Sequence, residues 1–152
     1  MNMFRAAAAL VTATVALSAC APEKQLYISD AWVRLAAVEG RPAAGYFTIH
    51  GGPTDTTLVS VTTDVAVRTE MHETKAAAGG GMTMDAVQQV PIPALQQVKF
   101  QPGGKHIMLF DLNPIVKPGG SITLTFTFAD ATRIQQNARV IAAGDPAPSQ
   151  KK

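Results

Sequence analysis

Hydrophobic and polar residues alternate along much of this chain, and the alternation is clearest over residues 121–128. This segment reads SITLTFTF, with Ile122, Leu124, Phe126 and Phe128 at every second position. Successive side chains of a β-strand point to opposite sides, so the pattern predicts a strand with one apolar face and one polar face. Similar segments recur along the chain, separated by glycine- and proline-containing stretches.

The same reasoning predicts a series of short strands and no long helix after the first 20 residues. We predict strands over 26–35, 43–50, 56–62, 65–71, 82–90, 105–112, 121–128 and 138–142. Strands of this length, with turn residues every 8 to 12 positions or so, are typical of β-sandwiches and barrels. The pattern predicts a single all-β domain.

The first 20 residues have the pattern of an export signal. Arg5 precedes an almost uncharged apolar run over 6–17, and small residues follow it up to Cys20. The run is too short to span a membrane as a stable helix. Two interpretations remain open: lipidation of Cys20, since LSAC at 17–20 resembles a bacterial lipobox, or simple cleavage and secretion. A lipid on Cys20 would anchor the protein to a membrane without spanning it.

The resulting division has four parts. We predict a lipoprotein signal peptide over 1–19, a lipidated tether over 20–26, a β-sandwich domain over 27–143 and a disordered tail over 144–152. Cys20 is the only cysteine, so an internal disulfide or a thiolate site within the domain is excluded. The formal net charge is +2, without basic clusters, which argues against nucleic-acid binding. No catalytic motif is apparent, and we predict that the protein is not an enzyme.

Soft metal ligands are concentrated in one part of the chain. Beyond the signal, all four methionines lie between positions 71 and 108, together with His72 and His106. In a strand, His106 and Met108 would project to the same side, about 6.6–7 Å apart. Met82 and Met84 repeat this spacing. Methionine on an apolar strand is usually a core residue, so either pair alone is weak evidence for a metal site.

The combination of donors nevertheless favours one kind of metal. Thioether sulfur and imidazole nitrogen together suit Cu(I), whereas magnesium and calcium prefer oxygen and zinc prefers Cys, His and carboxylate ligands. A blue-copper electron-transfer centre needs a cysteine thiolate, which this domain lacks. The residues therefore indicate a site that holds copper and can release it.

The spacing of these residues resembles the signature of the bacterial periplasmic copper chaperones of the PCuAC type. His72 and Glu73 are followed by ten residues, Met84, twenty-one residues, and then His106-x-Met108. Glu73 stands where the family often has methionine. The resemblance extends to DAWVR at 30–34, AAGYFTI at 43–49, MHET at 71–74, FQPGGKHIM at 100–108 and KPGG at 117–120.

The resemblance implies a cupredoxin-like Greek-key β-sandwich or barrel that binds one Cu(I) outside the cytoplasm, in the periplasm or cell envelope. It implies the ligands His72, Met84, His106 and Met108. Strand alternation places Met82 on the side of Met84, as a possible auxiliary ligand, and Met71 on the side opposite His72, in the core. The resemblance also implies delivery of copper to an apo cytochrome c oxidase subunit or exchange with a thiol-bearing copper chaperone. Two alternatives remain: a metal-free β-sandwich lipoprotein acting as an adaptor, and a copper storage or resistance protein.

Other conspicuous residues receive structural interpretations. Trp32 and Tyr46 are predicted to be core aromatics. His50 precedes two glycines, which favours a turn or surface role over metal ligation. Asp85 and Asp111 flank the candidate ligands and are either hydrogen-bond acceptors for a histidine or solvated carboxylates. The glycines at 79–81 are predicted to form a flexible hinge before Met82.

Overall fold

The computed structural model describes residues 24–149, which form ten β-strands. The predicted signal peptide and Cys20 lie outside this range, as do residues 150–152. The strands are β1 (Tyr27–Arg34), β2 (Ala43–His50), β3 (Thr56–Thr62), β4 (Ala66–Ala76), β5 (Met82–Ala86), β6 (Val90–Ile92), β7 (Gln97–Phe100), β8 (Lys105–Leu112), β9 (Ser121–Phe128) and β10 (Arg133–Ile141). Within residues 24–149 there is no helix with the length and hydrophobicity needed to cross a membrane. The all-β prediction is confirmed.

Four predicted strands coincide with β2, β3, β8 and β9, and β1 is one residue shorter at each end than predicted. Other boundaries were wrong. We placed the end of a strand at Met71, but β4 continues to Ala76, so His72 lies within the strand. The segment 82–90 is interrupted after Ala86, β10 begins at Arg133 rather than at residue 138, and β7 was not predicted. The extra segments are mostly polar and are held by backbone pairing, which hydrophobic alternation does not report.

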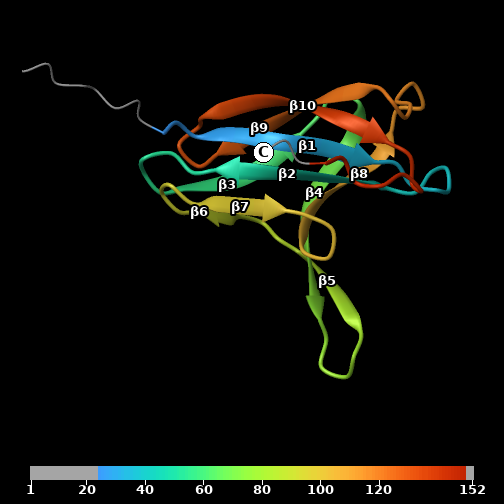
Figure 1. The fold of residues 1–152 in the computed structure, drawn as a ribbon, viewed down its shortest axis with the longest axis horizontal. Coiled ribbons are helices and arrows are strands. Elements are labelled where there is room, and N and C mark those ends of the chain that lie inside the picture. The colour runs from blue at the N-terminus through green and yellow to red at the C-terminus, as the bar shows by residue number, and fades with distance from the viewer. Residues whose placement is uncertain (1–23, 150–152) are drawn as a thin grey trace, which may run out of the picture.

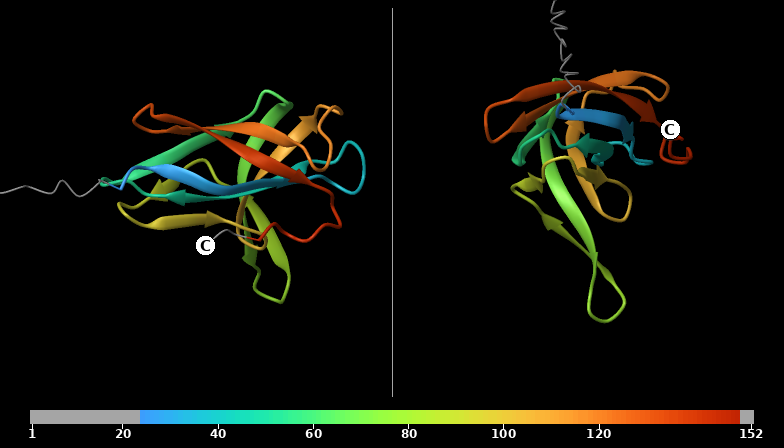
Figure 2. Two further views of the ribbon diagram at one scale, coloured as in Figure 1. Left: turned by 45° about the horizontal axis from the view of Figure 1, so that its top comes forward. Right: turned by 60° about the vertical axis from the view of Figure 1, so that its left-hand side comes forward.

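The strands form one sheet in the order β5-β4-β8-β7-β2-β1-β10-β9-β3-β6, with an additional pairing between β8 and β2. The strands wrap around a single core rather than lying in one flat layer (Figure 2). Phe47 lies near the middle of this core, stacked on Phe100 at 4.3 Å and edge-on to Phe126 at 4.7 Å between ring centroids. Buried residues from every strand except β5 contribute to the two buried clusters.

One hairpin extends away from this core. The distal half of β4 and the whole of β5 project from the body of the domain (Figure 1). We call residues 73–86 the arm. All five residues of β5 are exposed, so burial of apolar surface does little to hold it. Its tip is closed by a hydrogen bond from the Ala77 amide to the Gly81 carbonyl at 2.7 Å, and Gly79 and Gly80 have positive φ angles there. The predicted glycine hinge is the turn of this hairpin.

Candidate metal site

Strand register brings the four candidate ligands to one face of the sheet. His72 on β4 is paired directly with His106 on β8. Met108, two residues after His106, is paired with Glu70, two residues before His72. On the other side of β4, Met84 is paired with Thr74, which lies two residues after His72. Directly paired residues of antiparallel strands point to the same side, as do residues i and i+2. All four candidates therefore share one face of β5-β4-β8.

This face points away from the main core. Met71 and Ile107, which alternate with the ligands along β4 and β8, are paired with each other and buried at 7% and 0% exposure. The core assignment of Met71 is confirmed. Because neighbours along each strand point in opposite directions, burial of Met71 and Ile107 directs His72, His106 and Met108 outward.

The two histidines lie close together, with ring centroids 5.9 Å apart and ring planes inclined at 45°. His106 is buried, at 6% exposure, and its Nδ1 lies 3.0 Å from the backbone carbonyl oxygen of Gly104. A carbonyl only accepts hydrogen bonds, so Nδ1–H is the donor and Nε2 carries the free lone pair. His106 is thereby held in a tautomer that can ligate a metal through Nε2.

His72 is held in the other tautomer, with its proton on Nε2 and the lone pair on Nδ1. Its Nε2 lies 3.0 Å from a carboxylate oxygen of Glu70. Its Nδ1 is buried and has no hydrogen-bond partner among the described residues. A buried polar nitrogen without a hydrogen-bond partner lowers the stability of a protein by about 1–3 kcal/mol. Such atoms are therefore rare in well-packed proteins. A metal ion bound at Nδ1 would satisfy this atom.

The methionines occupy different environments on the same face. Met108 is half-buried, whereas Met84 and Met82 on the arm are 53% and 63% exposed. Met84 is diagonal to His72 across the β4–β5 pair, a relation that corresponds to about 7–8 Å. The structure thus brings the histidines and Met108 together beside the body and places Met84 on the same face of the arm. Met82 lies one step nearer the tip.

The reverse face of the arm is an ion-pair network. The Lys105 ammonium lies 2.7 Å from Glu73 and the Lys75 ammonium lies 3.3 Å from it, while Lys75 is also 3.8 Å from Asp85. The hydrogen bond from Lys105 lowers the pKa of the Glu73 carboxyl, with a smaller contribution from Lys75. Glu73 and Asp85 therefore point away from the histidines, so Asp85 is not a hydrogen-bond acceptor for His72.

The acceptor for His72 is instead Glu70, which the sequence interpretation did not identify. Asp111, the other candidate acceptor, is exposed and has a positive φ of 51° near the end of β8. Glu70 stands two residues before His72, the spacing that places two side chains on one face of a strand. That signal was present, but the predicted end of the strand at Met71 obscured it.

A small aromatic cluster lies beside the histidine pair. The Tyr46 ring centroid is 6.4 Å from that of His106 and 4.3 Å from that of Trp32, and the Arg34 guanidinium lies 5.0 Å above the Trp32 ring. Burial raises the pKa of the Tyr46 hydroxyl. The prediction that Trp32 and Tyr46 are buried is confirmed, but they form a cluster with Ile141 that is separate from the main core.

His50 lies at the far end of β2 and has structural contacts there. Its ring stacks on Tyr27 at 4.0 Å, its Nε2 lies 2.8 Å from the Ser29 hydroxyl, and its Nδ1 lies 3.2 Å from the Gln97 amide nitrogen. Ser29 itself donates to Asp30. His50 Nε2–H must therefore donate to Ser29, and this group is not a nucleophile–base pair.

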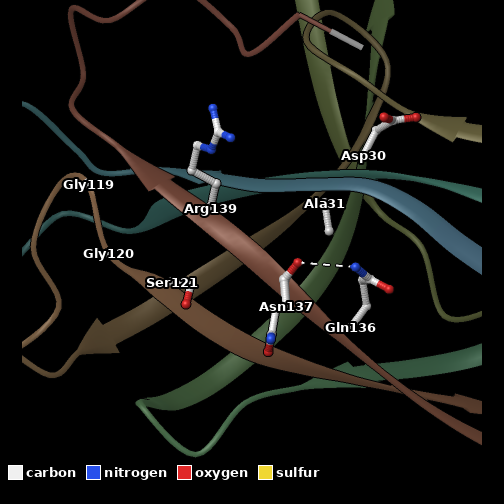
Figure 3. Close-up of a pocket in the computed structure, with 8 residues that line it drawn as sticks. All are labelled: Asp30, Ala31, Gly119, Gly120, Ser121, Gln136, Asn137 and Arg139. Atoms are coloured by element: carbon white, nitrogen blue, oxygen red, sulfur yellow. Dashed lines mark hydrogen bonds between the residues drawn. The ribbon is translucent and has the colours of Figure 1, made fainter. Parts of the chain in front are cut away.

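The candidate ligands are separate from the pocket drawn in Figure 3. Figure 3 shows a pocket between β1, β9 and β10, lined by Asp30, Arg139 and small or amide side chains, that includes none of them. In residues 24–149, no three His, Cys, Asp or Glu side chains are grouped closely enough to hold a metal ion. A site on this face depends on thioether sulfur as well as imidazole.

Comparison with known proteins identifies the family. Residues 26–140 match the family described as "Putative lipoprotein LpqE-like". The chain belongs to this family. The "Putative lipoprotein Lxx21020" of Leifsonia xyli subsp. xyli (strain CTCB07) is 33% identical over 118 residues, which are 76% of this chain and 70% of that protein. The LpqE-like chain thus shares most of its domain with another protein that is described as a putative lipoprotein.

Solved structures similar to this LpqE-like protein are PCuAC domains. The copper-bound PCuAC domain from PmoF2 is 21% identical, with a TM-score of 0.64 over 79% of this chain and 95% of that one. The Cu(I) form of DR1885 from Deinococcus radiodurans is 26% identical, with a TM-score of 0.59 over 83% of each chain. The predicted cupredoxin-like β-fold is confirmed by this similarity.

Proposed function

We propose that this LpqE-like protein is an extracytoplasmic copper chaperone that binds one Cu(I) through His72, Met84, His106 and Met108. The observation that carries the proposal is the directly paired histidines, each with one nitrogen occupied by an acceptor and the other available. The similarity to copper-bound PCuAC domains supports the same function. Copper is the cargo, and we assign the protein no catalytic activity.

The chemistry of the four donors suits a carrier. Two neutral imidazoles and two thioethers form a soft ligand set that favours Cu(I), but they leave its positive charge uncompensated. Such a site should hold Cu(I) less tightly than cysteine thiolates do. Transfer to a thiol-rich acceptor is therefore downhill. We infer that the acceptor is the copper centre of an apo cytochrome c oxidase subunit, or a thiol-bearing copper chaperone that acts with it.

The position of Met84 suggests how copper is captured. His72, His106 and Met108 lie on β4 and β8 beside the body of the domain, while Met84 lies on the exposed arm. We infer that copper first meets the histidines and Met108, and that the arm then bends or twists to bring the Met84 sulfur to the ion. Reversal of this movement would open a coordination position for the acceptor's ligand.

Copper binding is tested by titrating the mature protein with Cu(I) under reducing conditions against a competing chelator. We expect one Cu(I) per monomer and loss of this binding in the His106→Ala, Met108→Ala double variant. His50→Gln is the matched control because His50 lies outside the site, and it should bind normally. X-ray absorption should report two nitrogen and two sulfur neighbours. Undiminished binding by the double variant would refute the proposal.

Delivery is tested separately by mixing the Cu(I)-loaded protein with a purified apo CuA domain of cytochrome c oxidase, then separating the two and measuring copper in each. Transfer within minutes supports a chaperone. Retention of copper, with tight binding, would instead support the storage alternative.

A further inference from the structure

Within residues 24–149, the carboxylate of Glu70 is hydrogen-bonded to the candidate ligand His72. One oxygen of its carboxylate lies 3.0 Å from His72 Nε2, and the other is paired with the guanidinium of Arg68. Arg68 in turn lies 3.9 Å above the Phe110 ring centroid. Residues 68, 70 and 72 alternate along β4 and face Phe110, Met108 and His106 across β8. The contacts therefore run in series from Phe110 through Arg68 and Glu70 to His72.

We propose that Glu70 is a positioning residue that prepares His72 for copper. This inference rests on the proposed copper site. The Glu70 carboxylate accepts a hydrogen bond from His72 Nε2–H, which leaves the lone pair of the ring on Nδ1. The unpartnered, buried Nδ1 is the atom that this arrangement offers to the metal. Without an acceptor at Nε2, the neutral ring would distribute its proton between both nitrogens, and part of the population could not bind through Nδ1.

Arg68 limits where the Glu70 carboxylate can lie. Arginine stacked on an aromatic ring is held in a narrow range of orientations, and it fixes the oxygen that it contacts. The other Glu70 oxygen is then directed at His72. The carboxylate charge also partly compensates the charge that Cu(I) would bring to a set of neutral donors.

A purely structural role is the competing explanation. The Arg68–Glu70 pair has side-chain exposures of 54% and 36%, and pairs of this kind contribute little to stability. Removal of Glu70 should therefore change the free energy of unfolding only slightly, while the tautomer of His72 and the copper affinity change markedly. This contrast separates positioning from stabilisation.

The experiment compares Glu70→Ala and Glu70→Gln with Asp85→Asn, which removes a carboxylate on the reverse face of the arm. The tautomer of His72 is read in the metal-free protein at pH 8 from the nitrogen shifts of its ring by NMR. The wild type and Asp85→Asn should show the Nε2–H form, and Glu70→Ala should show a mixture. Glu70→Gln retains an acceptor oxygen and should restore most of the Nε2–H form.

Copper affinity provides the second measurement. Loss of such an outer contact should weaken Cu(I) binding by about 10–100-fold in Glu70→Ala. Glu70→Gln should lie between it and the wild type, and Asp85→Asn should differ little from the wild type. An unchanged His72 tautomer in Glu70→Ala overturns the inference. If the wild type bound no Cu(I), the proposed function would fail, yet the tautomer measurement would still decide the role of Glu70.

Discussion

At the scale of single residues, the three histidines differ in what their neighbours do to the ring. His106 and His72 each have one nitrogen occupied by an acceptor and are directed to the outer face. His50 has partners on both nitrogens and a stacked tyrosine. Residue type alone does not distinguish them. Their neighbours assign two to a candidate site and one to the support of a strand end.

His50 gives a prediction about pH. Burial lowers the pKa of His50, with Lys99 acting in the same direction and Asp30 opposing both. The folded protein therefore binds this proton less readily than the unfolded chain, whose histidine pKa is about 6.5. The resulting stability is fully present above about pH 6.5 and is lost as the pH falls through the lower, folded-state pKa.

We expect His50→Gln to remove this contribution, because glutamine does not titrate. In the metal-free protein, the free energy of unfolding in urea should fall less between pH 7.5 and pH 5 in the variant than in the wild type. His72 and His106 are present in both proteins, so the comparison isolates His50. The same pH dependence in both proteins would show that His50 contributes nothing to it.

At the scale of elements, the arm combines regular pairing with little burial. Its paired positions place Met84 and Met82 on the face of His72, but neither methionine is packed against the core. Elements held mainly by exposed backbone hydrogen bonds open at low free-energy cost. We propose that Met84, on such an element, approaches and leaves the copper while the histidines stay in place.

The two methionines of the arm should differ in their effect on copper. Met84→Leu keeps size and hydrophobicity but removes the sulfur, and it should weaken Cu(I) binding by at least about tenfold, or about 1.4 kcal/mol. Met82→Leu is the matched control and should change the affinity by less than about twofold. Chelator competition measures both. If both variants lost the same Cu(I) affinity, Met82 would be as important a ligand as Met84.

The sequence predicted the elements that alternate clearly and missed those that do not. β9 was located from a period-two pattern that its burial confirms, and β8 was located as a mainly apolar segment in which Ile107 and Leu109 are buried. The continuation of β4 past Met71 was missed because its side chains are mostly polar. β7 alternates, as QVKF, but it is only four residues long, and pairing with β2 reveals it. The contact of Glu70 with His72 was missed for the same reason, since it requires His72 to lie within a strand.

At the scale of the whole molecule, the order of strands brings together residues that are far apart in the chain. β4 and β8 are adjacent although 28 residues separate Ala76 from Lys105, and the long spacing of the ligand pattern becomes a direct pairing of His72 with His106. Sequence spacing suggested that these residues act together. Only the register shows that they share a face and that Glu73 is on the other.

The place where the chain enters the domain, at Leu26, determines which end of the domain a lipid anchor would hold. Leu26 lies against Gly52, just beyond the His50 end of β2, whereas Met108 is paired with Ala44 near the other end. β2 has eight residues, so its two ends are roughly 25 Å apart. A lipid on Cys20 would therefore tether the domain by the end remote from Met108, leaving the arm free to meet an acceptor.

This arrangement predicts that anchoring and copper binding are separable. We propose that Cys20 carries the lipid, so the wild-type protein should be recovered with the membrane fraction and Cys20→Ser should not. Because the proposed ligands all lie within residues 72–108, the mature soluble form should bind Cu(I) with the same stoichiometry and affinity as the detergent-solubilised wild type. Fractionation followed by chelator competition measures both properties. Copper binding that required the lipid would mean that residues before the domain complete the site, contrary to the division at residue 27.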